Sequence, residues 1–178
     1  MKKSILISIL IAIAGCVERK EKAATELYND KSVFCIRAQL PEAWSDYKGI
    51  RAFLDEDFIF QNIKGAKDTS SWMVLRVYEF KSVEQSRLNI DSILSWQINL
   101  VQTENKTTHL LSKNVNKRSS GKVIGYFDFT TKNANRLDYS RFLVFLKRKK
   151  IGVLELHHRV NQDTFLKIAN PITESLDY

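Results

Sequence analysis

The segment from Trp72 to Phe80 constrains the fold more than any other part of the chain, because it carries apolar side chains on both of its faces. Successive side chains of a β-strand point to opposite faces. As a strand, this segment places a tryptophan, a valine, an arginine and a tyrosine on one face, and a methionine, a leucine and a valine on the other. A strand with two apolar faces lies inside a sheet that is covered on both sides. The sequence therefore predicts a central strand at 72–80.

Other segments have the composition of strands and are bounded by turn-forming residues. They span 33–40, 58–63, 122–130, 141–146 and 151–160, with a weaker strand at 109–115. Residues 147–152 are expected to form the hairpin turn between the last two strands.

Two helices are predicted. Ser82 followed by Gln85 is a capping-box pattern, and apolar residues at three- and four-residue spacings continue to residue 102. Asn161 can cap a second helix near the end of the chain. Pro171 is expected to restart this helix as a short last turn, because proline is favoured at the first helical position.

Strands, a helix, more strands and a final helix, with hairpins between the strands, predict an α+β fold. The expected architecture is an α/β/α sandwich, with a mainly antiparallel sheet covered by one long helix and a C-terminal helix. A chain of 178 residues, 44% hydrophobic and 27% charged, has an ordinary globular composition. Because no Pro/Gly/Ser-rich break follows, one domain is expected at 32–178.

Residues 1–16 have the pattern of an export signal. Lys2 and Lys3 precede eleven apolar or small residues, which is shorter than the roughly 20 needed to span a bilayer and matches a signal-peptide core. The stretch ends in Ile-Ala-Gly-Cys, which resembles a bacterial lipobox. We expect residues 1–15 to be removed as a signal peptide and the thiol of Cys16 to receive a lipid.

Two other interpretations of this segment stay open: an ordinary signal peptide with an accidental cysteine, or an uncleaved anchor. Residues 16–31 are expected to be the lipidated cysteine and a charged tether. Val17 follows Cys16, where an aspartate usually retains a lipoprotein in the inner membrane. The resemblance therefore favours the periplasmic face of the outer membrane, with the membrane contacted through the N-terminal lipid.

The positive charge of the chain would by itself suggest a nucleic-acid partner, because the net charge is +8. Removal of Lys2 and Lys3 with the signal peptide lowers this charge to about +6. Export places the domain away from chromosomal DNA, so no nucleic-acid partner is expected. With Cys16 lipidated, Cys35 has no cysteine partner within the chain, and we expect it to be a buried small hydrophobe.

Phe34–Trp44 forms a strand that ends in a Pro-x-x-Trp turn, and the strand at 58–63 and a single long helix follow it. The chain closes with a hairpin and a last helix that ends at Ser175-Leu176. This pattern resembles the PsbP/Mog-like family, which includes DcrB-like exported lipoproteins. The resemblance implies an α/β/α sandwich and a binding, assembly or chaperone role without catalysis.

A search for catalytic or metal-binding residues begins with histidine. On the last strand, Glu155, His157 and Arg159 share one face, whereas His158 lies on the other. Adjacent histidines of a strand cannot ligate one metal ion together, so we expect no metal. The alternative is a site built on Glu155 and His157 with a third ligand from elsewhere.

Other catalytic motifs give no stronger signal. The chain has no G-x-S-x-G elbow, and its six glycines do not form a phosphate-binding loop. A pair of catalytic carboxylates stays open, because their separation depends on the fold. We therefore expect no enzyme and no cofactor. Four aromatic residues are expected to pack in the core, or alternatively to form one aromatic site: Trp72, Tyr78, Trp96 and Tyr126.

The basic residues are the remaining candidates. Lys147, Arg148, Lys149 and Lys150 form a hairpin tip, and a second group comprises Lys113, Lys117, Arg118 and Lys122. A charged tip can simply keep a hairpin soluble. As a functional site, it would contact an anionic surface or an acidic partner protein.

The sequence predicts a lipid-anchored, envelope-facing binding or assembly module without catalysis, whose partner is another envelope or secreted protein. The alternative is a periplasmic immunity protein that neutralises a secreted toxin. An envelope hydrolase built on Glu155 and His157 is a third possibility.

Overall fold

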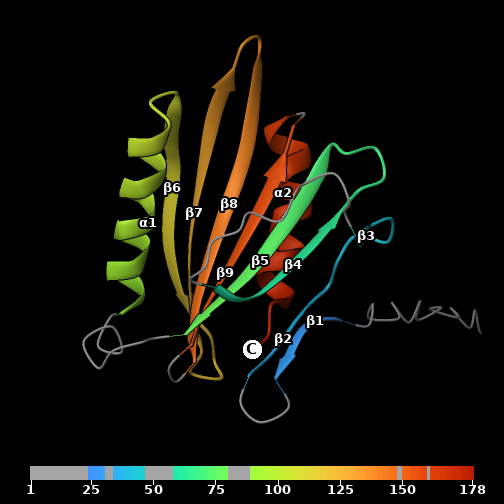
Figure 1. The fold of residues 1–178 in the computed structure, drawn as a ribbon, viewed down its shortest axis with the longest axis vertical. Helices are drawn as coiled ribbons and strands as arrows, with labels where there is room; N and C mark the ends of the chain where they lie inside the picture. The colour runs from blue at the N-terminus through green and yellow to red at the C-terminus, as the bar shows by residue number, and fades with distance from the viewer. Residues whose placement is uncertain (1–23, 31–33, 47–57, 80–88, 148–149, 160) are drawn as a thin grey trace, which may run out of the picture.

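The computed structural model describes residues 24–30, 34–46, 58–79, 89–147, 150–159 and 161–178 (Figure 1). The elements of this part of the chain are β1 (Thr25–Asp30), β2 (Phe34–Ala38), β3 (Ser45–Asp46), β4 (Phe58–Gly65), β5 (Ser71–Glu79), α1 (Ile90–Glu104), β6 (Thr108–Lys117), β7 (Val123–Asn133), β8 (Arg136–Lys147), β9 (Lys150–His158) and α2 (Gln162–Ser175).

Seven strands form one sheet in the order β3-β4-β5-β9-β8-β7-β6, and every neighbouring pair is antiparallel. β1 and β2 pair with each other as a separate two-stranded ribbon. β5 lies between β4 and β9, so the central strand expected at 72–80 is confirmed with bounds shifted by one residue.

The two helices cover opposite faces of the sheet. Along β8, Phe142 and Val144 pack with α1, whereas Leu143 and Phe145 pack with α2. Because neighbouring strand residues point to opposite faces, this alternation places the helices in separate layers (Figure 1). The predicted α+β sandwich, with an antiparallel sheet between two helical layers, is confirmed.

The larger apolar core lies on the α2 face. It joins the small ribbon to the sheet, because Leu27 of β1 and Ile36 of β2 pack into the same cluster as Leu75, Leu154 and Ile172. The smaller core lies under α1, which contacts β6, β7 and β8. Its centre is a group of three phenylalanine rings, of which the rings of Phe127 and Phe142 stack at 5.0 Å.

The predicted tether at 16–31 is wrong for its last part. Thr25–Asp30 is the strand β1, and the side chain of Leu27 is 2% exposed in the core. The globular domain therefore begins at least seven residues before the predicted boundary at 32. A strand with one fully buried leucine shows no apolar periodicity, which is why its sequence suggested a solvated segment.

Both helices differ from their predicted bounds. Asn89 caps α1, since its backbone is extended and its side chain accepts a hydrogen bond from the Ser92 amide at 2.8 Å. The helix thus begins eight residues after the predicted cap, Ser82, which lies outside the described residues. α2 runs unbroken through Pro171, so the predicted restart is wrong.

The hairpin turn expected at 147–152 is shorter than predicted, because β8 ends at Lys147 and β9 begins at Lys150. Cys35 is half-buried rather than buried, with its Sγ 3.9 Å from the Glu26 carboxylate. Among the described helices, neither is both long and apolar enough to cross a membrane.

Candidate functional site

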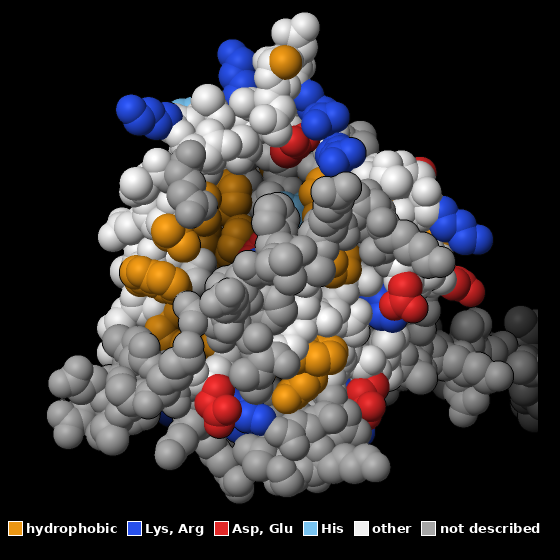
Figure 2. Space-filling view, in the orientation of Figure 1, with side chains coloured by type: hydrophobic (Ala, Val, Ile, Leu, Met, Phe, Trp, Pro, Cys, Tyr) orange, Lys and Arg blue, Asp and Glu red, His pale blue; other side chains and the backbone are white. Residues whose placement is uncertain are grey.

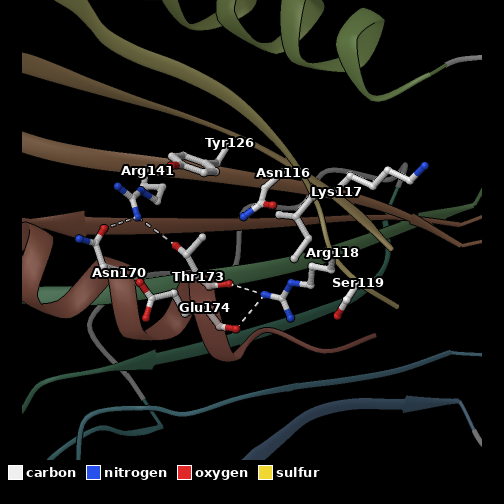
Figure 3. Close-up of a pocket in the computed structure, with 10 residues that line it drawn as sticks. Asn116, Lys117, Arg118, Ser119, Tyr126, Arg141, Asn170, Thr173 and Glu174 are labelled. Carbon is white, nitrogen blue, oxygen red and sulfur yellow. Dashed lines mark hydrogen bonds between the residues drawn. The ribbon is translucent and has the colours of Figure 1, made fainter. Parts of the chain in front are cut away.

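A cavity of about 530 Å³ opens on the α2 face beside the end of β6 (Figure 3). Ile124 and Tyr126 of β7 line its sheet side, and Asn170, Thr173 and Glu174 line its α2 side. The volume lies within the range of sites that hold small ligands or partner side chains. The wall between β6 and β7 is basic, because Lys117 and Arg118 contribute to it.

Arg141 lies at the deep side of the cavity and holds α2 against the sheet. Its Nε and Nη2 donate to the two carboxylate oxygens of Asp128 at 2.6 and 2.9 Å. Its Nη1 donates to Asn170 Oδ1 at 2.9 Å and to Thr173 Oγ1 at 3.0 Å. The guanidinium also lies over the ring of Tyr126, 4.6 Å from its centroid. Every nitrogen of this buried side chain therefore has a partner, as a buried charge requires.

Arg118 reaches α2 from the opposite side of the cavity (Figure 3). Its Nη2 donates to the carbonyl oxygens of Thr173 and Glu174, at 2.7 and 2.9 Å. These carbonyls belong to the last turn of α2, where a helix has unpaired acceptors and a negative dipole end. Lys117 is exposed and extends away from α2 in the same view.

The predicted basic residues converge only in part. Ile124 pairs with Phe145, and Lys147 pairs with Lys150, so 118–122 and the β8–β9 connection lie at one end of the sheet (Figure 1). Lys113 instead lies in the middle of β6, with its Nζ 3.6 Å from Asp91 of α1. Arg148 and Lys149, the middle of the predicted hairpin tip, lie outside the described residues, as does the predicted lipid site Cys16.

Lys122 joins the basic end of the sheet to the C-terminal segment through an ion pair with Asp177. The hydrogen bond from Lys122 lowers the pKa of the Asp177 carboxyl below its usual range. Next to it, Tyr178 donates its hydroxyl to the Val123 carbonyl at 2.9 Å, and burial raises the pKa of this phenol. The C-terminal residues are therefore part of the folded structure around the cavity end of the sheet.

A row of polar side chains crosses the α1 face over β5, β9 and β8. Arg76 pairs with Glu155, whose other oxygen lies 3.5 Å from His157 Nε2. His157 Nδ1 lies 2.9 Å from the hydroxyl oxygen of Ser140. The predicted sharing of one face by Glu155 and His157 is confirmed. The Ser140 residue is 5% exposed, so its hydroxyl is not presented to solvent as a nucleophile would be.

Trp72 covers one end of this row. Its ring stacks on the His157 ring at 5.0 Å, and the guanidinium of Arg159 lies 4.5 Å from its centroid. His158 points to the opposite face, as predicted, where its Nδ1 lies 2.6 Å from the Ser71 hydroxyl oxygen. Burial lowers the pKa of His158.

The four candidate aromatic residues do not form one site. Trp72 and Tyr78 lie on the α1 face and Tyr126 on the α2 face, while Trp96 is 60% exposed on α1, so the core prediction for Trp96 is wrong. The described residues contain no group of three histidine, cysteine or acidic side chains that could hold a metal ion.

The ion pair between Arg141 and Asp128 was not predicted, although the sequence contains a pattern that indicates it. The two residues are directly opposed in the β7–β8 hairpin. The pairing of the two strands runs without a shift from this position to Asn133 and Arg136, which flank the turn. Counting outward from that turn would have paired an arginine with an aspartate among apolar neighbours, which indicates a buried ion pair. This turn was not predicted, because alanine is not a typical turn residue, although Ala134 adopts a positive φ of 51°.

Comparisons with known proteins identify a fold rather than a family. No family model matches the sequence, and no curated protein matches it. Among solved structures, the crystal structure of LpqN, a protein involved in cell envelope biogenesis of Mycobacterium tuberculosis, is similar, with a TM-score of 0.50 and 11% sequence identity. The likeness covers 86% of this chain and 89% of that chain. At this identity, the match shows a shared fold.

Proposed function

We propose that the chain is a lipid-anchored protein of the cell envelope, which binds or assembles with another envelope or secreted protein and catalyses no reaction. The observation that carries the proposal is the fold shared with LpqN over 86% of the chain, since LpqN takes part in cell envelope biogenesis. The PsbP/Mog-like pattern of the sequence supports the same class of protein.

The lipobox-like sequence supports the anchor. Small residues before Cys16 suit the signal peptidase, and the thiol would accept a diacylglycerol. Two or more acyl chains hold a protein on a membrane stably, whereas one does not. With Val17 after the cysteine, the proposed location is the periplasmic face of the outer membrane.

The geometry of the polar row supports binding rather than catalysis. Glu155 is neutralised by Arg76, and Ser140 is enclosed by the sheet. An acid–base or nucleophilic site needs a reactive group that a substrate can reach. The cavity beside α2, by contrast, is open and lined by polar side chains from three strands, one turn and a helix.

The anchor is tested by labelling intact cells with a radiolabelled fatty acid. The unmodified chain is expected to take up label and Cys16→Ser to take up none. Cys35→Ser is the matched control, because it removes the other cysteine and should label fully. Label on the Cys16→Ser protein would overturn the proposed anchor.

The basic hairpin tip is tested separately for partner binding. Reversing Lys147, Arg148, Lys149 and Lys150 to glutamate is expected to weaken binding to acidic envelope proteins while changing the melting temperature little, because ion pairs at a protein surface contribute about 0–1 kcal/mol each. Thermal unfolding and pull-down of the same preparations check both parts. A large loss of stability would show that the tip is structural.

A further inference from the structure

We propose that the free edge of β6 binds an extended, acidic segment of a partner protein, which adds a strand to the sheet beside β6. This inference rests on the proposed binding function and specifies its site and the chemistry of its partner. Strand addition to an open edge gives affinity through main-chain hydrogen bonds and specificity through alternate side chains.

β6 is the long open edge of the sheet. It is ten residues long and ends the strand order, and within the described part of the chain it pairs only with β7. The opposite edge is β3, which has two residues. An edge strand presents unpaired N–H and C=O groups along its outer side, which is a template for another strand. β6 offers that template over most of its length.

The charged side chains in and next to β6 are all basic. Residues 105–122 contain four lysines, one arginine and one histidine, and no aspartate or glutamate. Among the described residues, only Lys113 and Lys122 of this segment make ion pairs, with Asp91 and Asp177. Lys106 and Lys117 contribute positive charge with no acidic partner there, so an acidic segment is favoured over a neutral or basic one.

The α1-facing side chains of β6 give the expected segment a pattern. Lys113, Val115 and Lys117 pair with Phe127, Gly125 and Val123, so all three lie on that face. Val115 is 44% exposed between the two lysines. Directly opposed residues of neighbouring strands interact. The complementary segment therefore carries an acidic, an apolar and an acidic residue at alternate positions.

The other face of β6 leads to the cavity. Asn116 lines it together with Arg118, which follows the strand directly, whereas the Lys117 side chain extends away from α2. Arg118 uses Nη2 for the two α2 carbonyls, and its Nε and Nη1 make no hydrogen bond to a described residue. A carboxylate from the bound segment can therefore reach a guanidinium that α2 already holds in position.

Lysines and a bulge on an edge strand also protect it from pairing with another sheet. β6 has both features, since its register to β7 shifts between Leu110 and Ser112. Two copies of β6 would place lysines near lysines, which disfavours self-association. The same charges attract an acidic strand, so protection from self-pairing and recognition of an acidic partner are compatible.

The test uses the full chain in detergent micelles and a fluorescein-labelled peptide with the repeat Glu-Thr-Val-Thr. We expect saturable binding by fluorescence anisotropy. A peptide with lysine in place of glutamate is expected to bind at least tenfold more weakly. A peptide N-methylated at alternate residues is expected to lose as much, because it keeps its charges but lacks backbone donors.

The protein variants separate this site from general electrostatics. Lys113→Glu/Lys117→Glu is expected to weaken binding about tenfold, and Val115→Asp to weaken it as well. Lys117→Glu alone is also expected to weaken binding, and Lys167→Glu is its matched control, because Lys167 is exposed on α2 and carries the same charge. We expect the control to bind as the unmodified chain does.

Several outcomes would overturn the inference: equal binding of the N-methylated peptide, an equal effect of Lys167→Glu, or binding to phosphatidylglycerol vesicles without binding to the peptide. The last outcome would make the basic strand a membrane contact. Failure of the peptide test with normal labelling of Cys16 would leave the proposed anchor intact, and the reverse result would leave the β6 site intact.

Discussion

The two faces of the sheet each carry an arginine–carboxylate pair, and the pairs differ in how completely they are enclosed. On the α2 face, Arg141 and Asp128 have side chains 4% and 8% exposed, and the guanidinium also bonds to two residues of α2. On the α1 face, Arg76 and Glu155 are 13% and 14% exposed, and the carboxylate lies near His157.

The two pairs therefore have different structural roles. Arg141 links two strands to α2, so it helps to position one wall of the cavity. Arg76 links β5 to β9 within the sheet and reaches no described helix through a hydrogen bond or ion pair. A charge that is more fully buried costs more when its partner is lost, so the two faces should respond unequally to matched substitutions.

The largest effect is expected for Arg141→Met. Among the described residues, it leaves the buried Asp128 with one remaining donor, the Ser112 hydroxyl at 3.1 Å, and should cost about 3–5 kcal/mol of unfolding free energy. Urea denaturation measures the change. Arg141→Met/Asp128→Leu should recover much of the stability, because no charge is then left unpaired. A loss below about 1 kcal/mol in the single variant would contradict this interpretation.

The two sheet glycines extend the comparison to packing. A Cβ on Gly152 would overlap the ring of Phe145 on the α2 face, whereas a Cβ on Gly125 would meet the flexible ends of Ile90 and Leu94 on the α1 face. Overpacking a core costs about 1–3 kcal/mol. Because a buried ring cannot turn aside as an aliphatic end can, Gly152→Ala should lie at the upper end and Gly125→Ala at the lower, by urea denaturation. The opposite order would mean that the α1 layer is the more rigid one.

Arg76→Met is expected to cost about 2 kcal/mol, less than Arg141→Met, because Glu155 keeps some access to water and lies near His157. The same denaturation experiment applies. Lys64→Met, which removes a pair with the exposed Asp46, serves as a control and should cost less than about 1 kcal/mol. Equal losses for Arg76→Met and Arg141→Met would remove the distinction between the faces.

The smallest effect concerns pH. Because burial lowers the pKa of His158 below its ordinary value of 6.5, the unfolded chain binds the proton more readily than the folded chain does. The contribution of neutral His158 to the unfolding free energy is therefore complete above pH 6.5. It decreases as the pH falls below 6.5, by at most about 1.4 kcal/mol per pH unit for one group. Unfolding free energies between pH 7.5 and 5 should show this slope, and His158→Gln should flatten it. An unchanged slope would assign the effect to another group.

Local pattern predicted the strands and the layers well, because apolar alternation reports burial directly. Both faces of β5 and the opposite directions of His157 and His158 followed from period two alone. The boundaries of the helices did not follow, since Asn89 and Ser82 are both residue types that are favoured as caps. Pro171 lies inside α2, next to Ile172, which is fully buried in the core of that face.

The cavity could not be predicted in the same way. Its walls combine residues of β6, β7 and β8 with residues of α2, which follow tens of positions later in the chain. Arg118 was noticed as a basic residue, but its role in holding the α2 carbonyls depends on a contact across 55 positions. Strand β1 was missed for a similar reason, because its buried Leu27 packs into a core built largely from later segments.

The bridge between β2 and the C-terminal segment has a consequence for the order of folding. Arg37 and Asp177 exchange two backbone hydrogen bonds of 2.8 Å across 140 positions, whereas the hairpins from β7 to β9 close over short turns. Closing a long loop costs entropy that only later contacts offset. We therefore expect the hairpins to form before this bridge. Ile36→Val, beside the bridge, should then raise the unfolding rate in stopped-flow experiments and leave the folding rate nearly unchanged.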